Sequence, residues 1–140
     1  MNYFEQIARM AGTLFNAEVD AANGQCEIKK TRALDICVGN SMKFSCTLDL
    51  DISFSALQED GIAFNKAEIF LLPGEFTAFT SRMIEYPVPL PTQYHQRMVT
   101  NPQIVCLYIE AFEAPEDFMG RIAAALKGLE EAKDQLTAAI

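Results

Sequence analysis

The chain has 140 residues, about the size of one globular domain, and its 19 acidic and 11 basic residues leave a formal charge of −8. Half of its residues are apolar, which is typical of a folded protein with its own core. An acidic chain with scattered basic residues repels phosphate backbones and anionic lipid headgroups, so nucleic acid and membranes are not expected as partners. We predict a single soluble domain over residues 1–140.

Cellular location is predicted from what the chain does not contain. Its first residues show no basic segment followed by an apolar stretch, as a secretory signal would. No window approaches the apolar length of a membrane span. The four cysteines form neither a C-x-x-C pair nor a zinc-finger spacing. We therefore expect reduced thiols and a cytoplasmic protein.

The first half of the chain predicts one helix followed by strands. Apolar residues recur at helical spacing over residues 3–16, as in an amphipathic helix. Short strands are predicted over 26–30 and 34–38. The clearest strand is 44–54, where apolar and polar residues alternate strictly, as in an antiparallel strand with one wet face.

The second half continues with a returning strand over 62–72, where a shift of the alternation near Asn65 predicts a bulge. A helix is predicted over 76–86, and a last helix begins at Pro115. With a hairpin between these two helices, the order is α-β-β-β-β-α-β-β-α. This order predicts an α+β two-layer sandwich, an antiparallel sheet with helices packed on one face.

The predicted hairpin carries the candidate site. Its strands, 93–99 and 103–111, flank a Thr-Asn-Pro turn, and a tight turn there places His95 opposite Cys106. The apolar residues of the second strand then face the core. The side chains expected together on the other face are His95, Arg97, Cys106, Tyr108 and Glu110.

Several interpretations of this face remain open. It is either the floor of a small-molecule or anion site or an ordinary solvated face. Pairing of Cys106 with His95 would suit a nucleophile, but no third group orients the pair. A metal held by His95, Cys106 and Glu110 would combine soft and hard ligands. We expect no catalytic residue, metal or cofactor, and hence a binding module rather than an enzyme, with a metal-dependent enzyme as an alternative.

Four segments of the chain resemble the LppY/LpqO family, domains without an assigned function. The strand-to-helix turn Glu68–Phe76 is similar to the family's D-L-V-L-T-x-x-E-V pattern. Thr92–Met98 is similar to T-A-L-H-N-H-M, and Asn101–Tyr108 to E-P-R-L-F-F-M-H. Phe118–Leu129 matches an alanine-rich helix of equal length. The resemblance implies a single, divergent member of the family.

The same resemblance implies a changed site. The family's three histidines fall at His95, Arg97 and Tyr108, so only one histidine is retained and a three-histidine metal centre is not expected. The resemblance therefore implies a degenerate histidine site.

The chain is also similar to the small acidic chaperones of bacterial type III secretion. The shared features are size, negative charge, a leading amphipathic helix and a twisted antiparallel sheet. This resemblance implies a dimeric protein-interaction domain that binds an extended peptide along a sheet edge or helix groove.

Overall fold

The computed structural model describes the backbone of residues 2–38, 42–101 and 104–138, and the side chains of 2–33, 45, 47–101 and 104–129. The elements in chain order are α1 (Tyr3–Phe15), β1 (Val19–Ala22), β2 (Gln25–Val38), β3 (Met42–Ser55), β4 (Ala63–Leu71), the 3-10 turn η1 (Pro73–Glu75), α2 (Phe76–Glu85), β5 (Tyr94–Asn101), β6 (Ile104–Glu113) and α3 (Pro115–Ala138).

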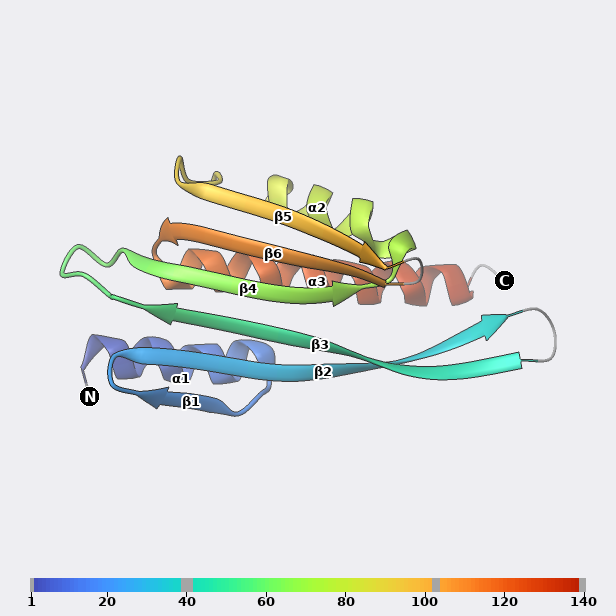
Figure 1. Ribbon diagram of the computed structural model, residues 1–140, viewed down its shortest axis with the longest axis horizontal. Helices are drawn as coiled ribbons and strands as arrows, with labels where there is room; N and C mark the ends of the chain where they lie inside the picture. Colours follow the sequence, from blue (N-terminus) through green and yellow to red (C-terminus); the bar gives the residue numbers. More distant parts are fainter. Residues whose placement is uncertain (1, 39–41, 102–103, 139–140) are drawn as a thin grey trace.

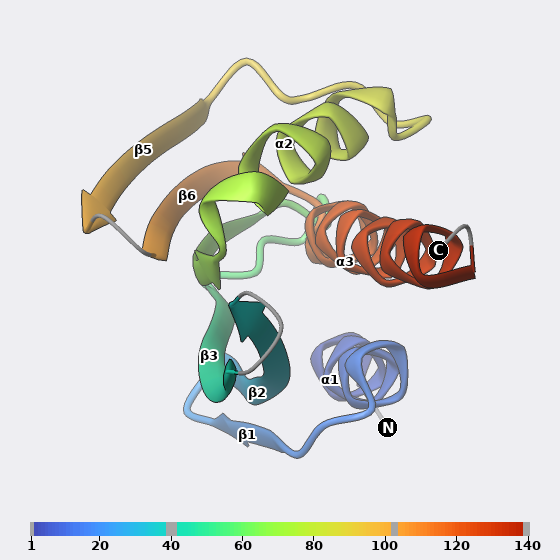
Figure 2. The same ribbon diagram turned by 90° about the vertical axis from the view of Figure 1, so that its right-hand side faces the viewer.

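All strands belong to one antiparallel sheet with the order β1-β2-β3-β4-β6-β5. The sheet twists along its length, and the three helices lie against one of its faces (Figures 1 and 2). The predicted α+β two-layer architecture and element order are therefore confirmed. Within the described part of the chain, no helix has both the length and the hydropathy to cross a membrane.

The core lies between the inner face of the sheet and the helices. Alternate residues of the central strands are buried there, as the period of two requires, and bulky side chains such as Phe54, Ile69 and Leu107 are almost completely enclosed. Helix α3 crosses behind this layer and buries Phe118 and Ile122 against it. Burial of each such side chain is worth roughly 1.5–3 kcal/mol, so this layer is the main source of stability.

Local signals fix the ends of α1. The Asn2 side chain accepts a hydrogen bond from the Glu5 N–H at 2.8 Å, which satisfies one free donor of the first turn. At the other end Asn16 adopts a left-handed conformation (φ 50°). The Lys30 ammonium also donates to the Phe15 carbonyl oxygen at 2.6 Å, which ties this helix end to β2.

The two short strands predicted over 26–30 and 34–38 form one strand, β2, and β1 is a strand that the sequence did not indicate. No break separates the two predicted segments, because pairing with β3 continues from Cys26 to Val38. Because β3 pairs with β4 only from Leu50 onward, the far ends of β2 and β3 form a two-stranded arm beyond the sheet (Figure 1). The turn predicted at residues 39–40 lies outside the described residues.

The bulge predicted near Asn65 is wrong. Pairing of β4 with β3 and with β6 continues without interruption through this position. Asn65 instead faces the core and is fully buried, and its amide nitrogen lies 3.0–3.1 Å from the carbonyl oxygens of Ala63, Ala111 and Glu113. A polar side chain on the buried face disturbed the apolar alternation without changing the backbone register.

A buried ion pair joins β6 to α3. Arg121 is completely enclosed, and its two terminal nitrogens lie 2.6 and 3.0 Å from the oxygens of Glu113. One of these nitrogens also donates to the carbonyl oxygens of Val88 and Pro89, each at 3.2 Å. Arg121 thereby fixes the proline-containing connection between α2 and β5 to the last helix.

Candidate functional site

The predicted site residues share the outer face of the sheet, but the predicted hairpin register is wrong. His95 lies opposite Glu110 rather than Cys106, a shift of four residues, and Arg97 lies opposite Tyr108. An even shift leaves each side chain on the same face, since successive strand residues alternate between faces. Strand β5 continues to Asn101 and β6 begins at Ile104, so Thr100 and Asn101 belong to a strand and not to the predicted turn.

The corrected register separates the proposed nucleophile from its base. Cys106 is paired with Val99, four residues from His95 along β5, which corresponds to about 13 Å. Proton transfer needs hydrogen-bond distance, so a Cys106–His95 pair is wrong. Among the described residues there is also no group of three histidine, cysteine or carboxylate side chains that could hold a metal ion.

Four of the outward side chains form a contact cluster across β4, β5 and β6. The Arg97 guanidinium lies 4.3 Å from the centre of the Tyr108 ring, a cation–π distance. The Cys106 sulfur lies 4.0 Å from a carboxylate oxygen of Glu68. Burial raises the pKa of the Cys106 thiol. The hydrogen bond between Tyr108 and Cys106 raises the pKa of Tyr108. A raised pKa keeps more of this thiol protonated, and a protonated thiol is a poor nucleophile.

Beside this cluster, the outer face contains a shallow polar recess of about 340 Å³. Four carboxylate residues line it, and burial raises the pKa of one of them, Asp51. His95 and Arg97 are not among its lining residues. An acidic recess attracts cations and repels anions, so its charge does not favour the anion ligand expected from the sequence. The carboxylate residues are Glu27, Asp51, Glu68 and Glu110.

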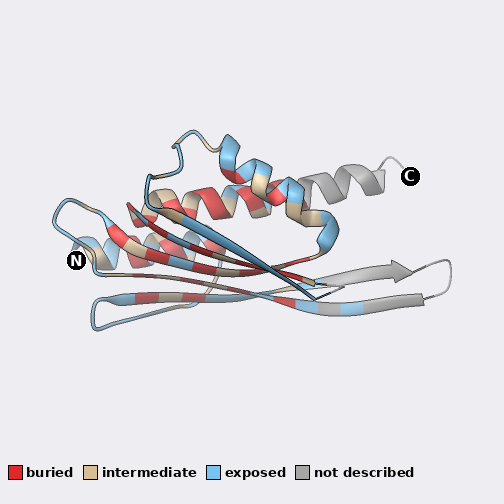
Figure 3. Cartoon of the chain, turned by 45° about the horizontal axis from the view of Figure 1, so that its top comes forward, coloured by how far each residue is buried: buried red, intermediate tan, exposed pale blue. Residues whose placement is uncertain are grey.

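Strand β5 forms one open edge of the sheet. All of its residues after Tyr94 are exposed, and no described strand pairs with its outer side (Figure 3). The Phe112 N–H donates to the Gln93 carbonyl oxygen at 3.1 Å, which identifies this pair as hydrogen-bonded. Hydrogen-bonded pairs alternate along an antiparallel ladder, so the odd-numbered residues of β5 bond to β6. The even-numbered residues direct their N–H and C=O groups away from the sheet.

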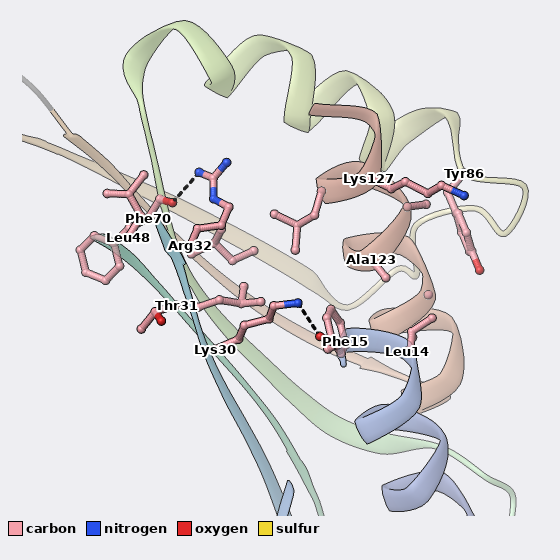
Figure 4. A pocket seen from close by; sticks show the side chains of 15 residues that line it. Leu14, Phe15, Lys30, Thr31, Arg32, Leu48, Phe70, Tyr86, Ala123 and Lys127 are labelled. Atoms are coloured by element: carbon pink, nitrogen blue, oxygen red, sulfur yellow. Dashed lines mark hydrogen bonds between the residues drawn. The ribbon is translucent and has the colours of Figure 1, made fainter. Parts of the chain in front are cut away.

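A larger, mostly apolar cavity of about 600 Å³ lies on the inner face of the sheet (Figure 4). Its wall is formed by β2, β3 and β4 on one side and by the end of α1 and the middle of α3 on the other. Lys30 and Arg32 belong to its lining. The sequence prediction missed this site because its residues come from segments far apart in the chain. The available signal was two basic residues continuing the inward face of β2 after Cys26 and Ile28.

Comparisons with protein-family models, with curated proteins and with solved structures found no match to this chain. The resemblances drawn from short motifs and gross properties therefore stay predictions.

Proposed function

We propose that this protein is a non-catalytic interaction module that binds an extended segment of a partner protein as an additional strand along β5. The observation that carries the proposal is the open edge of this eight-residue strand. Exposed edges normally carry protection, such as shortness, charge or proline. The opposite edge strand, β1, has four residues and contains Asp20, whereas the longer β5 has no proline and Arg97 as its one permanently charged residue.

Side chains on the edge also support a protein partner. Met98 and Val99 are each 47% exposed although both are large and apolar. They point to opposite faces of the sheet, so an added strand would cover both if it carried apolar residues at two adjacent positions, one on each face. In strand addition, main-chain hydrogen bonds supply much of the affinity and alternate side chains supply specificity.

The proposal agrees with the chaperone resemblance, which rests on a leading amphipathic helix and a twisted antiparallel sheet. It includes the predicted cytoplasmic location, which the two described free thiols, Cys26 and Cys106, support. A second copy of the chain is the competing occupant of the edge. Two chains of formal charge −8 repel one another at long range, which favours a different partner.

A substitution that removes one outward N–H tests the proposal. Peptides are first selected from a random displayed library on the wild-type protein. We expect Met98→Pro to weaken their binding at least about tenfold, because proline lacks the donor and remains tolerated on an open edge. Met98→Thr is the matched control, since it removes the same side chain but keeps the N–H, and it should retain most of the affinity.

Two results would contradict this function. One is equal binding of the selected peptides to Met98→Pro and wild type, with both proteins folded. The other is a wild-type dimer in sedimentation that Met98→Pro dissociates, because the edge would then be filled by a second copy.

The outer face around His95 and Arg97 supports a second candidate, a small-ligand site of the kind implied by the LppY/LpqO resemblance. Its supporting observation is the contact of Arg97 with Tyr108. We expect the double variant His95→Ala and Arg97→Ala to keep its stability within about 0.5 kcal/mol, since both side chains are exposed. Unfolding of this double variant would show that the two residues are structural.

A further inference from the structure

On its helical side, the cavity on the inner face is lined partly by small residues of α3. The residues that α3 contributes to this lining include Ala123 and Ala124, which leave space that larger side chains would fill. The sheet contributes Leu48, Leu50 and Ile69, and the end of α1 adds further apolar surface. The volume, about 600 Å³, lies within the roughly 300–1,000 Å³ of small-molecule sites.

Charge distinguishes this cavity from the rest of the molecule. Its described lining contains three cationic residues, Lys30, Arg32 and Lys127, and no carboxylate, although the chain has 19 acidic residues. Arg32 is neutralised by Glu75 just outside the lining, through two contacts of 2.8 Å. The positive potential inside the cavity therefore depends mainly on the two lysines.

Lys30 is the cation best placed to bind a ligand. Its ammonium donates to the Phe15 carbonyl oxygen, and no carboxylate of a described residue forms an ion pair with it. An ammonium has three donors, so two stay available. Figure 4 shows the Lys30 side chain running along the cavity wall toward the end of α1.

We infer that this cavity binds an amphipathic anion, a molecule with a single apolar chain and an anionic head, and that Lys30 binds the head. The apolar walls accept the chain, because removing apolar surface from water is favourable. The cationic residues exclude a positively charged head, and the absence of lining carboxylates favours a negative one. Carboxylate and phosphate heads share this chemistry.

Calorimetric titration with dodecanoate, dodecyl phosphate and dodecyltrimethylammonium, each below its micelle concentration, tests the inference. We expect one dodecanoate or dodecyl phosphate per chain and at least about tenfold weaker binding of the cationic probe. Comparison of the two anionic probes identifies the preferred head. An equal affinity of all three probes would overturn the inference, as would the absence of saturable binding.

Adjacent lysines on opposite faces of β2 provide a matched pair of variants. Lys30→Gln and Lys29→Gln change the net charge equally, but Lys29 lies on the outer face beside Glu27, at 3.3 Å. We expect Lys30→Gln to weaken dodecanoate binding about tenfold, the order expected for loss of a charged hydrogen bond, and Lys29→Gln to leave it unchanged. An equal effect of both variants would mean non-specific attraction and would overturn the inference.

A second pair of variants tests the location. Ala123→Phe fills the cavity from α3, and Ala78→Phe makes the same change at an exposed position of α2. We expect only Ala123→Phe to abolish dodecanoate binding. The inference is wrong if the wild type binds no probe and the Ala123→Phe variant differs from the wild type in its sedimentation. The cavity would then be a protein-docking site. Neither pair of variants alters the β5 edge, so this test is separate from that of the proposed function.

Discussion

Arg121 and Glu113 illustrate how much depends on single buried residues. The pair has almost no exposure, and the two terminal nitrogens of the guanidinium donate to the carboxylate oxygens at 2.6 and 3.0 Å. In such a pair the desolvation cost offsets much of the mutual attraction, but loss of one partner leaves an uncompensated buried charge. The arrangement therefore specifies how β6, α3 and the proline-containing connection fit together.

We expect Arg121→Met to lower the free energy of unfolding by about 3–5 kcal/mol, because Glu113 would be left buried without its cation. Urea denaturation measures this change. Adding Glu113→Gln to Arg121→Met should restore part of the loss, since the buried charge is then removed. If Arg121→Met alone were as stable as the wild type, the ion pair would not be needed for the fold.

Asp51 is expected to destabilise the folded protein at neutral pH. Burial first, and the neighbouring Glu27 second, raise its pKa above the ordinary value of 3.8. The folded state therefore binds this proton more tightly than the unfolded chain does. The resulting stabilisation is present below the ordinary pKa and is lost as the pH rises through the raised value.

Asp51→Asn should therefore raise the stability at pH 7 by about 0.5 kcal/mol, a small value because the side chain is partly exposed and screened. Thermal unfolding at several pH values measures the effect, which should vanish near pH 2, where the wild-type carboxyl is protonated. Asp49→Asn, on the same strand face, is the control. A gain that is independent of pH would contradict the assignment to Asp51 ionisation.

At the scale of elements, α2 and α3 pack closely because α3 carries glycines at the contact. A Cβ atom on Gly120 would meet the Tyr86 hydroxyl, and one on Gly128 would lie 3.0 Å from the Arg82 Nε atom. Glycine inside a helix costs roughly 1 kcal/mol relative to alanine. The two glycines weaken the helix, but they permit the close approach of α2.

We expect Gly120→Ala to destabilise the protein despite its higher helix propensity, because Tyr86 must move. The loss should be about 1–3 kcal/mol by chemical denaturation, the usual range for overpacking. With Tyr86→Phe in the same chain, Gly120→Ala should be tolerated better, since the clashing hydroxyl is absent. Stabilisation by Gly120→Ala alone would refute the close packing.

The elements also show what sequence patterns can predict in this chain. Strand β3 and helix α1 were predicted closely, because their apolar periodicity matches the face they bury. The register of β5 against β6 was predicted wrongly, because the turn position was taken from a Thr-Asn-Pro sequence while the pairing places Asn101 opposite Ile104. The prediction that these side chains share the outer face is unaffected, since a shift of four residues leaves each side chain on the same face.

Residues from distant segments explain the features that were missed. The cavity combines β2 with the end of α1 and the middle of α3, so no local pattern reports it. Asn65 was interpreted as a sign of a bulge. Its actual role could not be recognised locally, because two of its three carbonyl acceptors belong to β6, some 46–48 residues later. Contacts of this kind depend on the assembled fold.

At the scale of the whole molecule, three surfaces of different chemistry surround one sheet. The outer face carries an acidic recess, the inner face holds an apolar cavity with cationic residues, and β5 presents an open edge. In the proposed function the core supports the edge, and the acidic recess and the cavity lie away from the outer side of β5. The proposed partner binding and the inferred ligand binding would thus use separate parts of the molecule.

Amide hydrogen exchange along β5, measured residue by residue by NMR with and without a library-selected peptide, tests the central claim most directly. We expect the amides of Gln96, Met98 and Thr100 to exchange rapidly in the free protein and to become protected in the complex. The amides of Arg97 and Val99 should be protected in both states, because they bond to β6. Peptide binding that leaves Gln96, Met98 and Thr100 unprotected would contradict strand addition at this edge.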